Sequence, residues 1–180
     1  MIRIIGGELK GRRISAPASL PVRPTTDFAK EGLFNVLNNR FGFEEISALD
    51  LFSGTGNISF ELASRGCRDI TSVDGDIRCV NYISKTAREL HFSQIHTVKA
   101  DSYVFLARAR RTWDLIFADP PYAQKQAAEI PGLVFSHALL NTNGILIVEH
   151  EERFVFPDTS KLLERRRYGK VNFSIFGETN

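Results

Sequence analysis

The stretch that decides the fold is residues 46–56, ISALDLFSGTG, in which an apolar run leads directly into a turn that contains two glycines. Glycine has no Cβ, so it lets the backbone turn sharply and approach a bound ligand closely. Four more short apolar runs follow, at residues 70–73, 95–98, 115–118 and 145–148, and amphipathic stretches separate them. Because short strands that alternate with helices are typical of βαβ units, the sequence predicts an α/β fold with a parallel sheet.

The amphipathic stretches predict the helices that cover both faces of this sheet. Their apolar spacing places them at about residues 57–65, 77–90, 102–109 and 125–139. Towards the end of the chain, residues 162–176 predict a hairpin with Tyr168 and Gly169 at its turn. The hairpin is expected to add antiparallel strands to one edge of the sheet.

The segment before the sheet, residues 1–45, carries most of the positive charge. Short alternating segments at residues 2–5 and 12–14 predict a hairpin, residues 17–25 predict an extended proline-rich connector, and a helix is expected over about 27–40. The whole chain has a net charge of +2, whereas the first 30 residues contain six basic and two acidic side chains. Such a basic arm is either a phosphate-binding surface or an ordinary solvated one, and charge alone does not decide.

Length and composition predict a single domain, residues 1–180, because 180 residues with 43% hydrophobic side chains are typical of one soluble unit. No apolar run reaches the roughly 18 residues of a membrane span, and the N-terminus does not resemble a secretion signal, so a cytoplasmic location is expected. Cys67 and Cys79 have neither zinc nor redox spacing and are expected to act as small apolar residues. No metal site is predicted, since the acidic run at 149–152 indicates the charged end of a strand.

Ligands of parallel α/β sheets bind at the carboxyl ends of the strands, so the residues after each apolar run are the candidates for chemistry. The glycine turn is only half of a dinucleotide fingerprint, because the third glycine is missing. Asp74, after the second run, either caps the next helix or accepts hydrogen bonds from the ribose hydroxyls of a nucleoside, and its spacing from the glycine turn favours the ribose role. Asp101, after the third run, either accepts from an adenine amino group or caps the next helix, and Asp76 is expected to be a helix cap.

The most specific signal follows the fourth run, at Asp119-Pro120-Pro121-Tyr122. Two prolines fix the backbone and remove two N–H donors, which leaves a cluster of acceptors beside an aromatic ring. Such a group suits a planar base with an exocyclic amino group, because the ring stacks on the base and the acceptors hold the amino hydrogens. Accepting those hydrogens directs the nitrogen lone pair towards a methyl donor, so positioning and electrostatics would carry the reaction.

Together these motifs resemble the Rossmann-like, S-adenosyl-L-methionine-dependent amino-group methyltransferases. The N-terminal stretches RIIGG (3–7), KGRR (10–13), VRPTTD (22–27) and EGLFN (31–35) narrow the resemblance to the bacterial 16S ribosomal RNA guanine-N2 methyltransferases of the RsmD family. This family implies a Rossmann-like, seven-stranded, mostly parallel sheet with its last strand reversed and helices on both faces. It also implies an RNA-binding extension over residues 1–45, with a short hairpin and a helix, and a catalytic core over residues 46–180.

The resemblance implies three groups of site residues. Those of the S-adenosyl-L-methionine pocket are Asp50, Ser53, Gly54, Gly56, Asp74, Asp101 and Ser102. Those that hold a flipped guanine are Asp119, Pro120, Pro121 and Tyr122. Those that contact 16S rRNA, within a small-subunit ribosomal particle, are Arg3, Lys10, Arg12, Arg13, Arg23 and Thr25. One departure is Lys30, which stands where the family often has an arginine and cannot form a bidentate fork.

Three other functions compete with this interpretation. A DNA or RNA adenine-N6 methyltransferase would use the same acceptor motif, although the DNA enzymes usually need a target-recognition domain. An NAD-type oxidoreductase is disfavoured by the missing third glycine. A non-catalytic RNA-binding module would explain the basic arm, but it would not need both the glycine turn and the Asp-Pro-Pro-Tyr motif.

Overall fold

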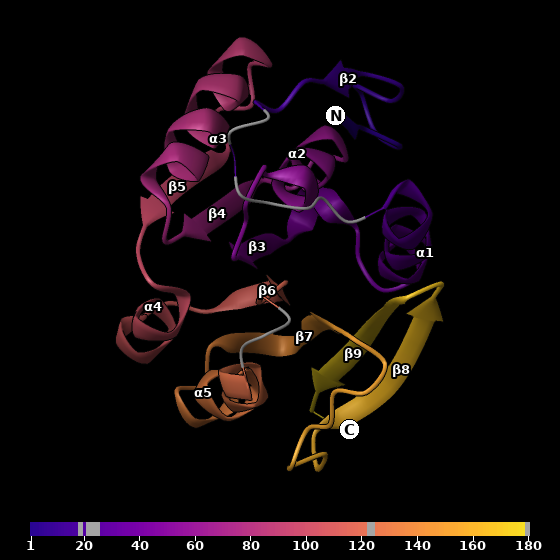
Figure 1. The fold of residues 1–180 in the computed structure, drawn as a ribbon, viewed down its shortest axis with the longest axis vertical. Coiled ribbons are helices and arrows are strands. Elements are labelled where there is room, and N and C mark those ends of the chain that lie inside the picture. The colour runs from indigo at the N-terminus through magenta and orange to yellow at the C-terminus, as the bar shows by residue number, and fades with distance from the viewer. Residues whose placement is uncertain (18–19, 21–25, 122–124, 179–180) are drawn as a thin grey trace.

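The computed structural model describes residues 1–17, 20, 26–121 and 125–178. At its centre lies a seven-stranded sheet with the order β5-β4-β3-β6-β7-β9-β8 (Figure 1). Strand β9 pairs antiparallel with both of its neighbours, and the other pairs are parallel. The predicted α/β, Rossmann-like sheet with a reversed last strand is therefore confirmed. The strands of this sheet are β3 (Ser47–Leu51), β4 (Asp69–Asp74), β5 (Ile95–Lys99), β6 (Trp113–Ala118), β7 (Leu140–His150), β8 (Leu162–Tyr168) and β9 (Val171–Gly177).

Helices cover both faces of this sheet, as the sequence predicts (Figure 1). On one face, α1 (Asp27–Asn38), α2 (Asn57–Ser64) and α3 (Ile77–Glu89) share a hydrophobic core with the side chains of β3, β6 and β7. On the other face, α4 (Ser102–Arg108) and α5 (Ile130–Ser136) form a second core. A short 3₁₀ helix, η1 (Phe43–Glu45), leads into β3.

The prediction of one helix over residues 125–139 is wrong in detail. A 3₁₀ helix, η2 (Lys125–Glu129), comes first, and α5 begins only at Ile130. Pro131 explains the break, because proline lacks an N–H donor and fits only the first turn of an α-helix. Strand β7 also begins earlier than predicted, at Leu140, so the connection between helix and strand is short.

Two further expectations concern the interior and the membrane. Cys67 and Cys79 are both buried, as expected for small apolar residues. Within the described ranges, no helix combines the length and the apolar character that crossing a bilayer requires.

The N-terminal arm forms a separate two-stranded sheet from β1 (Ile2–Arg3) and β2 (Arg13–Ile14), which run antiparallel. The glycine pair that follows β1 lies directly against helix α2. A Cβ on Gly7 would stand 1.8 Å from the carbonyl oxygen of Ser64, and the Ser64 hydroxyl donates to the Gly6 carbonyl at 2.7 Å. Close approach of the two backbones therefore requires glycine here, and it fixes the arm on the helix that follows the glycine turn.

The C-terminal hairpin, formed by β8 and β9, contacts helix α1. The Tyr168 hydroxyl at its turn donates to the carbonyl oxygen of Gly32 in α1 at 3.1 Å. A Cβ on Gly32 would lie 2.1 Å from the Tyr168 ring, so the helix needs a glycine where the ring packs. Two distant stretches that carry the family resemblance, EGLFN and the Tyr168 corner, thus meet in space.

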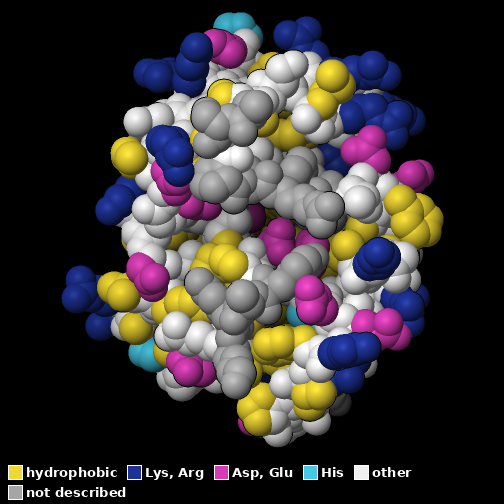
Figure 2. Space-filling model, viewed as in Figure 1, with side chains coloured by type: hydrophobic (Ala, Val, Ile, Leu, Met, Phe, Trp, Pro, Cys, Tyr) yellow, Lys and Arg dark blue, Asp and Glu magenta, His cyan; other side chains and the backbone are white. Residues whose placement is uncertain are grey.

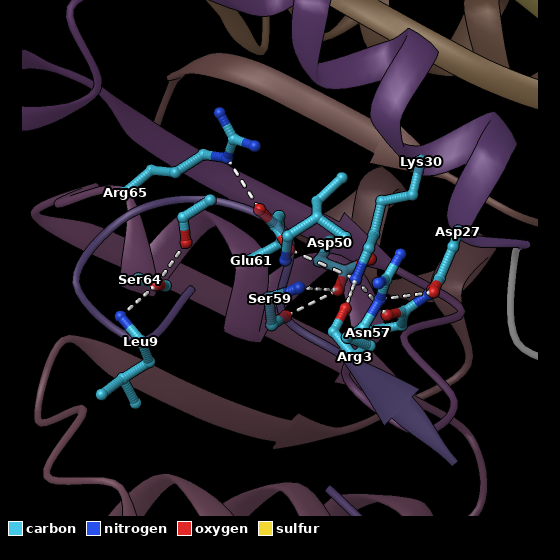
Figure 3. A network of polar contacts seen from close by, with 12 residues as sticks. Arg3, Leu9, Asp27, Lys30, Asp50, Asn57, Ser59, Glu61, Ser64 and Arg65 are labelled. Atoms are coloured by element: carbon cyan, nitrogen blue, oxygen red, sulfur yellow. Dashed lines mark hydrogen bonds and ion pairs between the residues drawn. The ribbon is translucent and has the colours of Figure 1, made fainter. Parts of the chain in front are cut away.

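A buried ion pair joins the arm, α1 and α2 (Figure 3). The Lys30 ammonium, whose side chain is 0% exposed, donates to the Arg3 carbonyl at 2.6 Å and to Asn57 Oδ1 at 2.9 Å, and it lies 3.2 Å from Glu61 Oε2. Its three N–H groups therefore have three acceptors. Glu61 is equally buried, and it also accepts from Arg65 Nε at 2.8 Å. Lys30, which stands where the family often has an arginine, thus has one acceptor for each of its three N–H groups. This arrangement does not require the forked donor geometry of a guanidinium group.

Replacing Lys30 tests how far the fold depends on this pair. Lys30→Met keeps an unbranched side chain but removes the charge that faces the buried Glu61 carboxylate. We expect the free energy of unfolding, measured by urea titration, to fall by about 3–5 kcal/mol. The matched control is Lys85→Met, because Lys85 is exposed and lies 3.8 Å from Glu89. That change should cost less than about 1 kcal/mol, and equal losses in the two variants would contradict a central role for Lys30.

Candidate active site

The carboxyl ends of four neighbouring strands are in register. Leu51 at the end of β3 pairs with Val73 of β4 on one side and with Ala118 of β6 on the other. Ala118 in turn pairs with Val148 of β7. The next residues, Phe52, Asp74, Asp119 and Glu149, therefore stand in one row along this edge of the sheet. In the space-filling view, acidic side chains lie on the floor of a central hollow (Figure 2).

The row lies at the point where the strand order reverses. From β3 the chain moves outwards through β4 to β5, and it then returns to place β6 on the other side of β3. Ligands of open α/β sheets bind in the crevice at this switch point. The predicted cofactor turn, after β3, and the predicted base-binding motif, after β6, thus lie on adjacent strands at the switch point.

The glycine turn has the backbone that its sequence predicts. Gly54 and Gly56 have φ values of 54° and 74°, and Phe52 before them has an unusual φ of 55°. Both the amide and the hydroxyl of Ser53 donate to the Val73 carbonyl, at 3.0 and 3.1 Å. Gly56 is the N-cap of α2 and offers no side-chain acceptor to the first N–H groups of the helix. The positive end of the helix dipole at this point suits the negative end of a ligand that lies over the turn.

Asp74 stands where the ribose of a nucleoside cofactor is predicted. Its Oδ2 accepts from the Gly54 amide at 2.8 Å, and its Oδ1 accepts from the Asp76 amide at 2.8 Å. A carboxylate oxygen has capacity for more than one hydrogen bond, so these contacts orient Asp74 and leave room for ribose hydroxyls. Asp76 accepts from the Arg78 amide and caps α3, as predicted.

Asp101 and Ser102 support the turn from the third strand end. Asp101 Oδ1 accepts from the amides of Tyr103 and Val104, at 2.9 and 3.0 Å, so its predicted role as a helix cap is confirmed. The buried Ser102 hydroxyl accepts from the Phe52 amide at 3.3 Å. The structure thus gives Ser102 a contact with the strained end of β3, and the adenine contact of Asp101 stays a prediction.

Asp50 lies beneath the turn. Its Oδ2 accepts from both the amide and the hydroxyl of Ser59, at 3.1 and 2.6 Å, so it holds the first turn of α2. Burial raises the pKa of Asp50 to about 7, with a smaller contribution from the charge of Asp74, although the hydrogen bonds from Ser59 oppose the shift. Among the residues predicted for the cofactor pocket, Asp50 is thus the one that fixes the turn from inside the protein.

Asp119 begins the predicted base-binding motif. Its amide lies 3.4 Å from the Leu51 carbonyl, which ties the motif to the end of β3. Burial raises the pKa of Asp119 well above its usual value, and the charges of Glu149 and Asp50 raise it further. Pro120 is buried and Pro121 is exposed, while Tyr122 lies outside the described residues. A hollow of about 160 Å³ adjoins the motif, and its lining includes Pro120, Pro121, Ala127, Glu149, His150 and Phe154.

The sequence did not predict that Glu149 is buried and lines the hollow beside the Asp-Pro-Pro motif. The run at 149–152 was expected to be the charged end of a strand, but Glu149 is only 2% exposed. His150 is also buried, and its ring nitrogens lie 2.8 Å from the Ser174 hydroxyl and from the Glu151 carbonyl. Within the described part of the chain, no group of His, Cys, Asp and Glu side chains is arranged to hold a metal ion. The signal for Glu149 was its place directly after an apolar run, the same place that Asp119 has.

The basic arm is only partly described. Lys10, Arg12 and Arg13 are exposed. Arg3 is also accessible, but its Nε lies 2.8 Å from Asp27 Oδ2, so part of its charge is neutralised within the protein. The predicted RNA contacts Arg23 and Thr25 lie outside the described residues.

The sheet order, the reversed last strand and the ligand turn after β3 place this chain in the class of Rossmann-like methyltransferases. The family described as Conserved hypothetical protein 95 matches residues 2–177. The chain belongs to this family, which is the RsmD family, so the resemblance drawn from its motifs is confirmed.

Individual relatives agree with this assignment. The ribosomal RNA small subunit methyltransferase D of Haemophilus influenzae is 30% identical over 181 residues, which cover 97% of this chain and 93% of the relative. A solved structure from Escherichia coli, described as a candidate methyltransferase, is 26% identical with a TM-score of 0.86, over 97% of this chain and 96% of its own. A candidate methyltransferase complexed with S-adenosylhomocysteine shares the fold, with a TM-score of 0.65 and 20% identity, over 81% of this chain and 48% of that one.

The raised pKa of Asp50 predicts a pH dependence of stability. Between about pH 4 and pH 7 the unfolded chain loses the Asp50 proton while the native protein keeps it, so the free energy of unfolding falls as pH rises. Asp50→Asn still accepts from Ser59 but has no proton to lose. The stability of the wild type relative to this variant should therefore fall by about 1–4 kcal/mol between pH 4 and pH 7.5. Urea titrations across this range measure the difference, and a constant value would refute the titration of Asp50.

Proposed function

We propose that this protein transfers a methyl group from S-adenosyl-L-methionine to the exocyclic N2 amino group of a guanine in 16S ribosomal RNA. The observation that carries the proposal is the join between the two predicted sites, where the Asp119 amide lies 3.4 Å from the Leu51 carbonyl. The acceptors of the Asp-Pro-Pro motif thus adjoin the glycine turn. The ribosomal RNA named for the Haemophilus influenzae relative supports the substrate class.

The residues around the turn fit S-adenosyl-L-methionine. Asp74 would accept from the ribose hydroxyls, and Asp101 from the adenine amino group. The positive end of the α2 helix dipole, at Gly56, would attract the carboxylate of the methionine part. When bound, this cofactor supplies an electrophilic methyl group on a sulfonium ion. Asp50 and Ser53 would act through the turn, because their side chains bond to Ser59 and to the Val73 carbonyl.

Asp119 would position the methyl acceptor. The lone pair of an exocyclic amino nitrogen is delocalised into the base, so the nitrogen is a poor nucleophile. When Asp119 and the Pro120 carbonyl accept the amino hydrogens, the nitrogen is drawn towards tetrahedral geometry and its lone pair is directed at the methyl donor. The N–C bond would form as the bond between the sulfonium sulfur and the methyl group breaks, which would leave S-adenosylhomocysteine, and the methylated nitrogen would give its extra proton to water. Tyr122 would stack on the flipped base.

Residues 1–45 would serve as the RNA-binding extension and residues 46–180 as the catalytic core of one domain. The arm carries exposed Lys10, Arg12 and Arg13, which suit phosphate groups and would orient the RNA without reading its sequence. The proposed substrate is 16S rRNA within a small-subunit ribosomal particle, and the cytoplasmic location stays a prediction.

A methylation assay with nucleoside analysis tests the proposal. Small-subunit particles from a strain that lacks the enzyme are incubated with it and labelled S-adenosyl-L-methionine, and the 16S rRNA is digested for mass analysis. We expect N2-methylguanosine at one position. The same motif suits adenine N6, so N6-methyladenosine would support the competing function, and an absence of labelled RNA would refute both.

Asp119 variants test the chemistry in the same assay. Asp119→Asn still accepts through its amide oxygen and should keep measurable single-turnover activity, whereas Asp119→Ala should lose at least about 10²-fold more. Both should bind S-adenosyl-L-methionine as the wild type does. Full activity of Asp119→Ala with saturating RNA would remove the catalytic role from this motif.

The basic arm makes a separate prediction about RNA. Replacing Arg12 and Arg13 with alanine should raise the Michaelis constant for RNA and flatten the salt dependence of binding by about one to two charges. Affinity for the cofactor should stay the same by calorimetry. The matched control replaces Arg108 and Arg110, which are exposed beyond the other face of the sheet. If both double variants have the wild-type salt slope, the arm does not contact the RNA.

A further inference from the structure

Glu149 faces the proposed methyl-acceptor site from the strand next to Asp119. Ala118 of β6 pairs with Val148 of β7, so the residues that follow them, Asp119 and Glu149, are cross-strand neighbours. Phe117 and Ile147, two residues before each, belong to the same hydrophobic core. Because side chains alternate along a strand, Asp119 and Glu149 project from that same face.

Position 149 is unfavourable for a charged side chain because it is buried. The alternation that begins with Ile145 and Ile147 calls for an apolar side chain at the next position, but the chain has a carboxylic acid there that is 2% exposed. A buried carboxylate is unfavourable unless its surroundings use it. Glu149 also adjoins Asp119 closely enough that its charge raises the pKa of that residue. Asp119 and Glu149 are thus neighbouring carboxylic acids at the ends of β6 and β7, and Glu149 lines the hollow together with Pro120 and Pro121.

The Watson–Crick edge of guanine offers two kinds of donor side by side, the N1–H and the N2 amino group. Two neighbouring carboxylates match this edge, since each accepts hydrogen bonds. On adenine the corresponding edge pairs one amino donor with a bare N1 acceptor, which a carboxylate repels. A flipped base is read through this edge, so an acceptor next to Asp119 would distinguish the two purines.

We propose that Glu149 is the specificity-determining residue, which accepts the N1–H of the target guanine while Asp119 accepts from its N2 amino group. The inference rests on the proposed function, because it assumes that the amino group to be methylated is N2 of guanine. It gives the buried acid at the end of β7 a direct contact with the base. It also explains why a motif that suits any exocyclic amino group acts on guanine.

A change in the base and a change in Glu149 test this contact together. The substrate is 16S rRNA with either guanine or 2-aminopurine at the modified position that mass analysis identifies. 2-Aminopurine keeps the amino group to be methylated, but its N1 is an acceptor without hydrogen. The wild type should methylate guanine at least about tenfold faster in single turnover, the scale of one hydrogen bond to a charged group. Glu149→Gln can donate to the bare N1 through its amide, so the preference should fall about tenfold or reverse.

The controls separate a direct contact from a structural role. Glu152→Gln changes an exposed neighbour that pairs with Arg167, and it should keep the wild-type preference. If Glu149→Gln slows both substrates equally, Glu149 is structural and the inference is overturned, although guanine methylation by the wild type still supports the proposed function. If Glu149→Gln does not fold, the wild type decides alone, since equal rates on the two bases overturn the inference. If the wild type methylates neither base, the proposed function fails as well.

Discussion

The buried pair of Lys30 and Glu61 is the constraint on which the rest of the structure depends. A lysine ammonium without water must find an acceptor for each of its three N–H groups. Those acceptors come from Arg3 at the start of the chain, from Asn57 directly after the glycine turn, and from Glu61 one helical turn further on. The arm, α1 and α2 must therefore be in place together, because the loss of α1 or α2 leaves a charge unpaired in the core and the loss of the arm leaves an N–H group of Lys30 without its acceptor.

Helix α2 therefore connects the glycine turn to the basic arm. Its first turn forms the floor of the cofactor turn through Asp50, and its last turn carries the arm through Ser64. The α2 helix has only eight residues, so there is little room for the two ends to move independently. A basic arm that would orient RNA is thus mounted on the element that would orient the methyl donor, and Asp119, which would position the methyl acceptor, follows β6, the strand next to β3.

Local sequence patterns predicted most of the strands and helices. They did not predict the contacts between residues that are distant in the sequence. The apolar runs identified β3 to β7, because a buried strand leaves its mark on neighbouring residues, and the same periodicity placed α2 and α3. The periodicity could not show that α5 begins only at Ile130, with Pro131 in its first turn, because the apolar spacing continues through the 3₁₀ helix and the α-helix. The motifs after the strands predicted that Asp74 and Asp119 lie at the carboxyl edge of the sheet, and the register of β3, β4 and β6 places them there. The role of Lys30 and the place of Glu149 depend on register and on packing between elements, which no stretch of the sequence reports by itself.

The contact between Tyr168 and Gly32 has a consequence for how the protein is made. Its two partners are separated by 136 positions, so the strands that carry the tyrosine are synthesised well after helix α1. During synthesis, helix α1 emerges early with the face intended for the aromatic ring still bare. Until the final hairpin folds back, this face is exposed apolar surface, which makes a nascent chain prone to association. The packing of helix α1 beside the basic arm is therefore completed only after strands β8 and β9 have been made.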